Sequence, residues 1–224
     1  MDSNLILKPI ELLDIGIDKL TKMPVPILNE NMVSTFDNDN GVPTSTFNFT
    51  YDASYGGLTI IISLSAIYPT NITFDFGSGQ TETFLVQTGN TSKTHVYTYL
   101  RQYTITIYGD LDKISKLYLN GCGGIISANL NNLRKLIILD ISGNRLTSLN
   151  LGGMIYLQNI SVKDNYLYND DIDDVYATTD LIPYNPLAVA KSLDTTGPNN
   201  GTPSSYSTIA ISNLTFKGWT LLHN

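Results

Sequence analysis

Leucine and isoleucine recur at a fixed interval between residues 114 and 167, and this periodicity constrains the fold more than any other feature of the chain. Three segments share the pattern L-x-x-L-x-L-x-x-N/C-x-L. The first contains Ile114, Leu117, Leu119 and Cys122, the second Leu136, Leu139, Ile141, Asn144 and Leu146, and the third Leu157, Ile160, Val162, Asn165 and Leu167. The second and third sets are offset by 21 residues at every position, and the first and second by 22, which places one inserted residue near Gly124–Ile126.

This pattern predicts one short strand in each repeat, with alternate residues pointing inward. The asparagine at the end of each strand can hydrogen bond to main-chain groups of the turn that would otherwise be unpaired. Cys122 can fill the same position as a small, buried and weak donor. Leu130 and Leu151 lie at matching places before the second and third repeats.

The segment 111–168 therefore resembles the leucine-rich repeat proteins, and the resemblance implies a short solenoid. About three repeats need a cap at each end. We expect a preceding β-domain to cap the N-terminal end. The linker from Tyr108 to Ile114 is too short for a free hinge, so the two modules should stack rigidly.

The outward strand face of the solenoid is the expected binding surface. It would comprise Lys116, Tyr118 and Asn120 of the first repeat, Ile138, Asp140 and Ser142 of the second, and Asn159, Ser161 and Lys163 of the third. This small, mixed stripe suits a modest contact with a protein or glycan. The sequence favours a plain solvated face slightly over such a contact.

Short alternating strands with turn signals between them predict a β-sandwich over residues 36–110. Asp37–Gly41 reads as a turn. The expected strands contain the alternating Phe47, Phe49 and Tyr51, then Leu58–Ile67, Ile72–Phe76, Thr81–Val86, Val96–Tyr99 and Tyr103–Tyr108.

Residues 45–110 resemble the PKD family. Ile72–Glu82 is similar to that family's F-D-F-G-D-G-x-x-E signature, with Ser78 where the family usually has Asp. Thr94–Tyr99 and Tyr103–Ile107 are similar to its H-x-Y and Y-x-V-x-I strands. The resemblance implies an Ig/PKD-like sandwich, so the fold class we expect is mainly β: a sandwich, a short solenoid and a small cap.

The segment 169–224 is expected to form the C-terminal cap. Its acidic start, Asn169–Tyr176, suits a helix N-terminus. Ser207–Phe216 followed by Lys217-Gly-Trp-Thr220 resembles the closing segment of repeat proteins from gut bacteria and their phages, with Leu221 in place of the usual Val. The resemblance implies a helix, a final strand and Trp219 as a cover for the last repeat.

Residues 1–35 read as an arm that is dense in apolar residues but interrupted by Pro9, Pro24 and Pro26. It could dock on the body or on a neighbour, or it could form a first strand that closes the sandwich. As a particle anchor it would use Leu5, Ile6, Leu7, Ile10, Leu12 and Leu13.

Composition limits the partners. The net charge is −7 and no run of Lys or Arg occurs, which argues against binding to nucleic acid. No apolar run reaches the ~20 residues of a membrane span, so we expect no membrane insertion. We expect no signal peptide. Charged residues make up only 15% of the chain, and such an uncharged polar surface is typical of extracellular and virion proteins.

Candidate catalytic and metal-ligating residues each have a structural interpretation. His95 lies in an alternating strand, His223 at the C-terminus, and Cys122 in a repeat without a nearby base. The glutamates Glu11, Glu30 and Glu82 are not paired for glycoside hydrolysis. Asp37 and Asp39 fit a turn, and Asp170, Asp171, Asp173 and Asp174 fit a helix start, although calcium remains open for both groups. We expect no enzyme activity and no cofactor.

The sequence favours a structural or binding protein of a phage particle: a head decoration, a head fibre or a tail-associated component. Its partners would be capsid or tail proteins, with further copies of the chain and a host glycan or protein as other options. Multiple copies would strengthen a weak contact at the displayed face. The alternative is an adhesin-like module on a bacterial cell surface.

Overall fold

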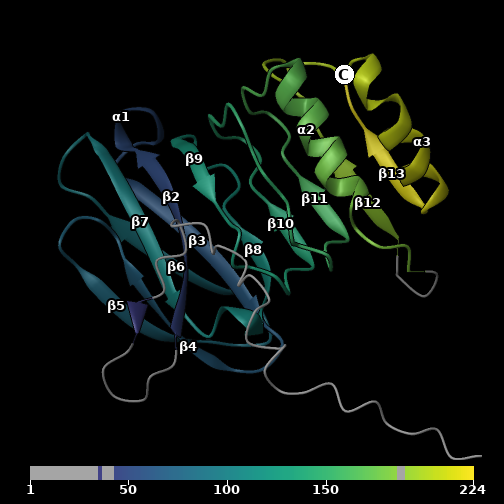
Figure 1. The fold of residues 1–224 in the computed structure, drawn as a ribbon. Helices are drawn as coiled ribbons and strands as arrows, with labels where there is room; N and C mark the ends of the chain where they lie inside the picture. The colour runs from purple at the N-terminus through teal and green to yellow at the C-terminus, as the bar shows by residue number, and fades with distance from the viewer. Residues whose placement is uncertain (1–34, 37–42, 186–189) are drawn as a thin grey trace, which may run out of the picture. The chain divides into compact units, whose positions relative to one another are not determined.

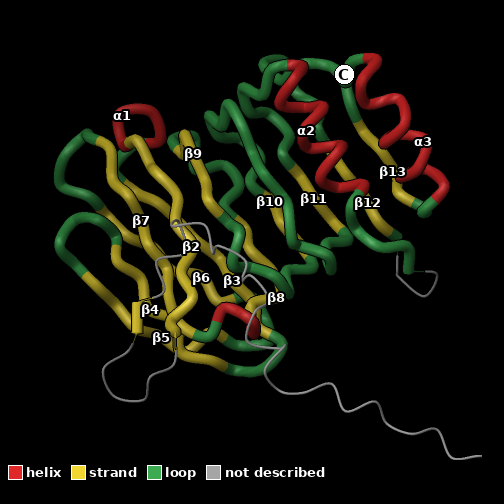
Figure 2. Tube along the Cα trace, viewed as in Figure 1, coloured by secondary structure: helices red, strands yellow, loops and turns green. Residues whose placement is uncertain are grey.

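The computed structural model describes residues 35–36, 43–185 and 190–224, and within these ranges the protein is mainly β. Residues 34–224 form one compact unit. Figure 2 shows strands in both halves of the described chain, with the two longer helices near the C-terminus. The expected arm and its anchor residues Leu5, Ile6, Leu7, Ile10, Leu12 and Leu13 lie outside the described residues, as do Asp37 and Asp39.

Six strands form the first sheet (Figure 1). They are β1 (Thr35–Phe36), β2 (Pro43–Asp52), β7 (Gln102–Gly109), β4 (Thr70–Asp75) and β5 (Thr81–Val86) in spatial order, with β9 (Ile125–Asn129) pairing to β2. All these pairings are antiparallel. The four-residue helix α1 (Ala53–Gly56) follows β2 directly.

Seven strands form the second sheet. Their order is β13 (Trp219–Leu222), β12 (Lys191–Asp194), β11 (Asn159–Ser161), β10 (Ile138–Asp140), β8 (Ile114–Tyr118), β3 (Thr59–Ala66) and β6 (Thr91–Val96). In this sheet β8, β10, β11, β12 and β13 run parallel to one another. Strand β3 pairs antiparallel with both β8 and β6. One sheet therefore joins the first half of the chain to the periodic half.

Strand alternation explains which side chains form the core. Ile60, Ile62 and Leu64 of β3 are buried, while the alternate residues Thr59 and Ile61 are exposed. Because successive strand residues face opposite sides of a sheet, this pattern buries one face of β3. The buried apolar side chains of both sheets and both longer helices belong to one continuous cluster.

The periodic leucines lie side by side in the second sheet. Leu117 pairs in register with Leu139, and Leu139 with Ile160, and all three are buried. We number the stretches that start at each parallel strand as segment 1 (residues 114–137), segment 2 (138–158), segment 3 (159–190) and segment 4 (191–218).

Segment 4 is a finding that the periodicity did not predict. Its strand β12 continues the parallel register, with Leu193 beside Ile160. Asn200 makes the same set of backbone bonds as Asn144 and Asn165, although a helix and a longer connection separate it from them. The insertion of α2 (Asn169–Asp180) conceals this fourth unit from a search at constant spacing.

The C-terminal part contains α2, α3 (Thr208–Phe216) and the final strand β13. Short 3-10 helices occur at Leu111–Lys113 and Ser205–Ser207. Figure 1 shows α2 and α3 side by side on one side of the parallel strands. Ile172, Val175 and Tyr176 of α2 are buried there, and Trp219 is only 4% exposed.

One expected strand is misplaced. We expected Val96–Tyr99, but the strand is Thr91–Val96, and the chain bends after it. Tyr97 is buried by its ring stacking on Tyr103, with the ring centroids 3.8 Å apart, and its hydroxyl donates to the carbonyl of Phe76. The aromatic alternation therefore indicates burial that continues beyond the end of the strand. The strand itself was missed because its first residues, Thr91–Thr94, are polar.

Candidate functional site

The nine predicted stripe residues lie along the face of the second sheet that is opposite the buried leucines. Their register places Lys116, Ile138 and Asn159 in one cross-strand row. Tyr118, Asp140 and Ser161 form the next row, and Asn120, Ser142 and Lys163 follow the strand ends. All nine are half-buried or exposed, so the structure brings the whole predicted set together on one face.

This face extends beyond the predicted residues on both sides. Ser192 and Asp194 continue the two rows on β12, and Ser65 and Ser63 continue them on β3, although Ser65 is buried. The hydroxyl of Ser192 donates to the side chain of Asn159 at 3.0 Å, and the hydroxyls of Ser63 and Ser92 are 2.7 Å apart. We call this surface, from β6 to β13, the outer sheet face. It mixes uncharged polar side chains with charges of both signs, since Lys116, Asp140, Lys163 and Asp194 all lie on it.

Three buried asparagines hold the consecutive segments in register. The Nδ2 group of Asn165 donates to the carbonyls of Ile141, Val162 and Lys163, and its Oδ1 accepts from the backbone N–H of Leu146. Asn144 and Asn200 repeat this arrangement one segment earlier and one later. Each asparagine therefore bonds to its own turn and to the preceding segment. This ties the positions of the outer sheet face to one another.

A second candidate site is an open hollow of about 400 Å³ that the sequence reasoning missed. We call it the tyrosine hollow, and it is lined by Tyr55, Ile126, Arg145, Thr147, Tyr166 and Tyr168. Segments 1, 2 and 3 contribute Ile126, Thr147 and Tyr168 at the 21-residue spacing of the repeat. That spacing was the available signal, since it also places Arg145 beside Tyr166.

Tyr55 reaches the hollow from the other half of the molecule, and glycines allow it to do so. Helix α1 lies against the turn Gly121–Gly124 of segment 1. A Cβ added to Gly124 would be 2.5 Å from the carbonyl oxygen of Asp52, and one added to Gly56 would be 2.4 Å from that of Cys122. Neither position has room for a side chain, so this backbone contact brings Tyr55 alongside segment 2.

Arg145 lies between two aromatic rings in the hollow. Its guanidinium carbon is 4.1 Å from the ring centroid of Tyr55 and 5.2 Å from that of Tyr166. Within the described ranges, no carboxylate forms an ion pair with Arg145. Asp52 is close enough for Arg145 to help lower its pKa, but hydrogen bonds from the backbone of Ser54 and the side chain of Gln102 engage that carboxylate.

The rim of the hollow is aromatic and accessible. Tyr55 is 58% exposed and Tyr168 is 71% exposed, which is high for two large rings that line the same hollow. Their hydroxyls and that of Thr147 add polar groups around the guanidinium of Arg145. The hollow thus combines ring faces, hydroxyls and one positive charge.

Cys122 and His95 occupy structural positions. Burial raises the pKa of the Cys122 thiol to about 11, and its Sγ lies 3.5 Å from the carbonyl oxygen of Ile61, so Cys122 occupies the asparagine position of segment 1. His95 stacks on Phe76, with ring centroids 4.0 Å apart, and burial lowers its pKa. His223 is exposed.

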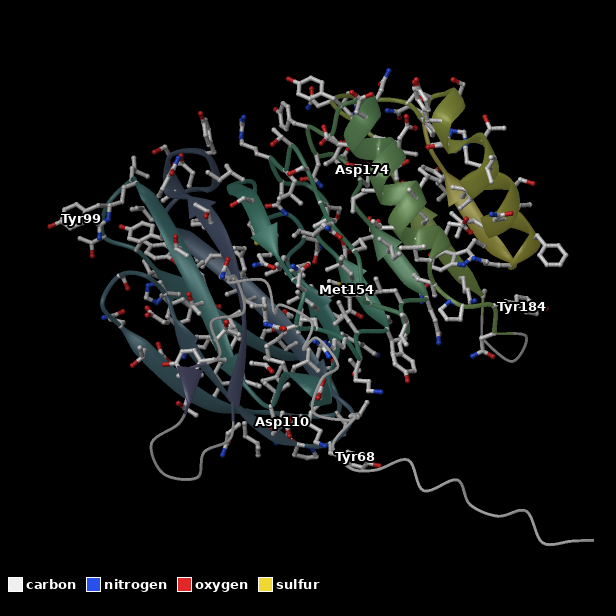
Figure 3. All side chains as sticks on the ribbon, in the orientation of Figure 1. Tyr68, Tyr99, Asp110, Met154, Asp174 and Tyr184 are labelled. Carbon is white, nitrogen blue, oxygen red and sulfur yellow. The ribbon has the colours of Figure 1, made fainter. Side chains whose placement is uncertain are left out.

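One acidic residue of α2, Asp173, has a structural role. Burial alone would raise the pKa of Asp173, but hydrogen bonds from Ser204 and Ser207 outweigh it and hold the pKa below its ordinary value. These bonds join α2 to the turn before α3. Asp174 lies on the exposed side of α2 (Figure 3), where it lines a shallow hollow of about 260 Å³ with Asp171 and Thr178. In the described part of the chain no group of three or more His, Cys, Asp or Glu residues is placed to hold a metal ion.

Comparison of the chain with protein-family models, with curated proteins and with solved structures finds no match in any of the three. Among the helices that the structure describes, none has the length and apolar character needed to cross a membrane. The chemistry of the two surfaces is therefore the basis on which a function can be argued.

Proposed function

We propose that this chain is a non-enzymatic structural and binding protein of a phage particle, as a head decoration, a head fibre or a tail-associated component. In this proposal the N-terminal segment attaches the chain to capsid or tail proteins, and the outer sheet face is displayed. The protein would be located in the virion.

A PKD-like sandwich followed by a short leucine-rich repeat solenoid is the finer fold that we propose. The parallel register of β8, β10, β11 and β12 supports the repeat. The recurring asparagine bonds support it independently, because each one joins consecutive segments in the same way. The turn at Gly77 and Gly79, with φ values of 67° and 86°, is consistent with the glycine-rich PKD signature.

The single observation that carries the function is the continuity of the outer sheet face. Antiparallel pairing of β3 with β8, which has one register shift between Ser65 and Ala66, extends this face from the first half of the chain into the parallel segments. A sheet of this kind holds its surface groups at fixed separations. Fixed separations favour a displayed, static contact surface over a mobile one, and many copies on a particle would add avidity.

A non-enzymatic role is supported by the state of the candidate catalytic groups. The Cys122 thiol, with a pKa of about 11, is protonated at neutral pH. Glu82 is engaged by the ammonium group of Lys93. A screen for glycan hydrolysis tests this part of the proposal, and turnover would contradict it.

Mass spectrometry of purified phage particles tests the location. We expect peptides of this chain at a constant ratio to the major capsid protein through successive density gradients. A truncated chain that begins at residue 36 should be lost from the particles, whereas a variant altered in the outer sheet face should remain. Particles that lack the full-length chain would overturn the proposal.

The tyrosine hollow favours a second candidate, an adhesin-like module on a bacterial cell surface. Exposed tyrosines around an arginine that forms no ion pair with the described residues suit recognition of an external ligand, which a purely structural component does not need. Fractionation of the producing cells separates the two proposals, because an adhesin would be recovered with the envelope in the absence of particles.

A further inference from the structure

The tyrosine hollow has the composition of a ligand site, and it is separate from the outer sheet face. Its volume of about 400 Å³ is within the range of small-molecule sites. Four stretches of chain build it: α1 and segments 1, 2 and 3. The close approach of Gly56 and Gly124 backbones holds these stretches together, so the hollow is part of the folded structure.

The guanidinium of Arg145 defines the charge that a ligand would carry. Both flanking contacts, to Tyr55 and Tyr166, are to ring faces, which restrain the plane of the guanidinium but accept none of its strong N–H hydrogen bonds. Asp52 is already bonded to Ser54 and Gln102. Within the described part of the chain, the outward N–H groups of Arg145 are therefore available to a planar, bidentate acceptor, and a carboxylate matches that geometry.

The exposed rings define the rest of the ligand. Tyr168 and Tyr55 present accessible faces, and hydroxyls of Tyr and Thr147 surround them. A pyranose ring has an apolar face of C–H groups that can lie on an aromatic ring, and hydroxyls at its edge that can bond to neighbouring hydroxyls. A hollow that is wide and open suits a ring within a chain better than a small, enclosed metabolite.

We propose that the tyrosine hollow binds a carboxylate-bearing sugar unit of a glycan, with Arg145 pairing with the carboxylate and Tyr168 and Tyr55 stacking on the pyranose rings. The proposal does not depend on the particle location, because the site is complete within one chain. A peptide carboxylate has the same charge but no pyranose face, and it is therefore the competing ligand in the test.

Saturation-transfer NMR on the full chain tests the assignment. The probes are four oligosaccharides that carry glucuronate, galacturonate, mannuronate or sialate, each beside its carboxyl-reduced counterpart, and an acetylated peptide amide whose carboxylate is an aspartate. We expect at least one acidic sugar to bind at least 10-fold more tightly than its reduced form and than the peptide. Raising the salt from 50 to 500 mM should weaken that binding several-fold.

Variants assign the binding to the hollow. Arg145→Gln should abolish the preference for the acidic form, and Tyr168→Ala should weaken acidic and reduced forms alike by at least 5-fold. Arg134→Gln and Tyr206→Ala are the matched controls, since Arg134 is exposed elsewhere and Tyr206 is 88% exposed, and both should bind as the parent does. Should Arg145→Gln not fold, Thr147→Glu replaces it, because Thr147 is exposed and a carboxylate there should repel the acidic probes alone.

Three results would overturn the inference: no saturable binding of any acidic sugar up to 20 mM, equal binding of acidic and reduced forms, or a preference that survives both Arg145→Gln and Thr147→Glu. A peptide that binds more tightly than every sugar would also overturn it. Purified chain is sufficient for each measurement, so these outcomes are independent of whether the protein is found in particles.

Discussion

Asn165→Ala offers the sharpest test of how the periodic half is held together. Asn165 is 0% exposed, and among the bonds of the described chain its Oδ1 is the sole partner of one buried backbone group, the N–H of Leu146. The three carbonyls that accept from Asn165 keep a partner when the amide is removed. Ile141 also accepts from Asn144, and Val162 also accepts from Asn200. Lys163 accepts from Gly143. The substitution therefore leaves one buried group unpaired.

An unpaired buried group costs about 1–3 kcal/mol, so Asn165→Ala should lower the free energy of unfolding by about 1–3 kcal/mol. That is a measurable part of the 5–15 kcal/mol typical of a folded domain. Urea denaturation followed by the fluorescence of Trp219, the single tryptophan, measures the loss. Asn150→Ala is the control, because Asn150 is exposed and accepts a hydrogen bond from Gly152 at the surface. A loss below about 1 kcal/mol for Asn165→Ala, or one equal to the control, would refute the reasoning.

Three further outcomes are expected. Gly124→Ala should lower the free energy of unfolding by about 1–3 kcal/mol, because the added Cβ forces α1 away from segment 1. The control Gly89→Ala, where a Cβ meets open space, should leave the thermal midpoint unchanged. Equal midpoints for the two variants would contradict the close approach. Burial lowers the pKa of Lys191 below its usual 10.5, so the unfolded chain binds more protons between the two values and stability should rise with pH in that window. Lys191→Met should therefore raise the unfolding free energy at pH 7 by about 1 kcal/mol, and a decrease in urea denaturation would oppose this. At pH 8 a thiol reagent should react with native Cys122 about 100-fold more slowly than with the unfolded chain, because its pKa is about 11 rather than 9.0; equal rates would contradict its burial.

The spacing of apolar residues predicted the short strands β8, β10 and β11, because a fixed interval depends on local geometry alone. It predicted the buried positions of Leu139 and Ile160 and the bonds of Asn165 to its own turn, but not its bonds to the preceding segment. It did not predict β12, since α2 and a longer turn interrupt the interval before Asn200. Constant spacing finds only uninterrupted units.

The two candidate sites also differ in how far the sequence predicts them. The outer sheet face could be predicted, because alternation assigns every second strand residue to it. The tyrosine hollow could be predicted only in part, since the spacing aligns Ile126, Thr147 and Tyr168 but gives no information about Tyr55. Tyr55 arrives through a contact between Gly56 and Gly124, and two glycines in a sequence do not specify which backbone they approach.

The parallel pairing between β10 and β11 has a consequence for the growth of this architecture. Each parallel strand contacts only its two neighbours through backbone bonds, and the asparagine links reach no further than the preceding segment. A duplicated stretch of 21 residues inserted there would lengthen the sheet by one strand spacing, ~4.8 Å, and leave both ends chemically intact. The distance from the first sheet to the C-terminus can thus be changed in steps of one strand spacing.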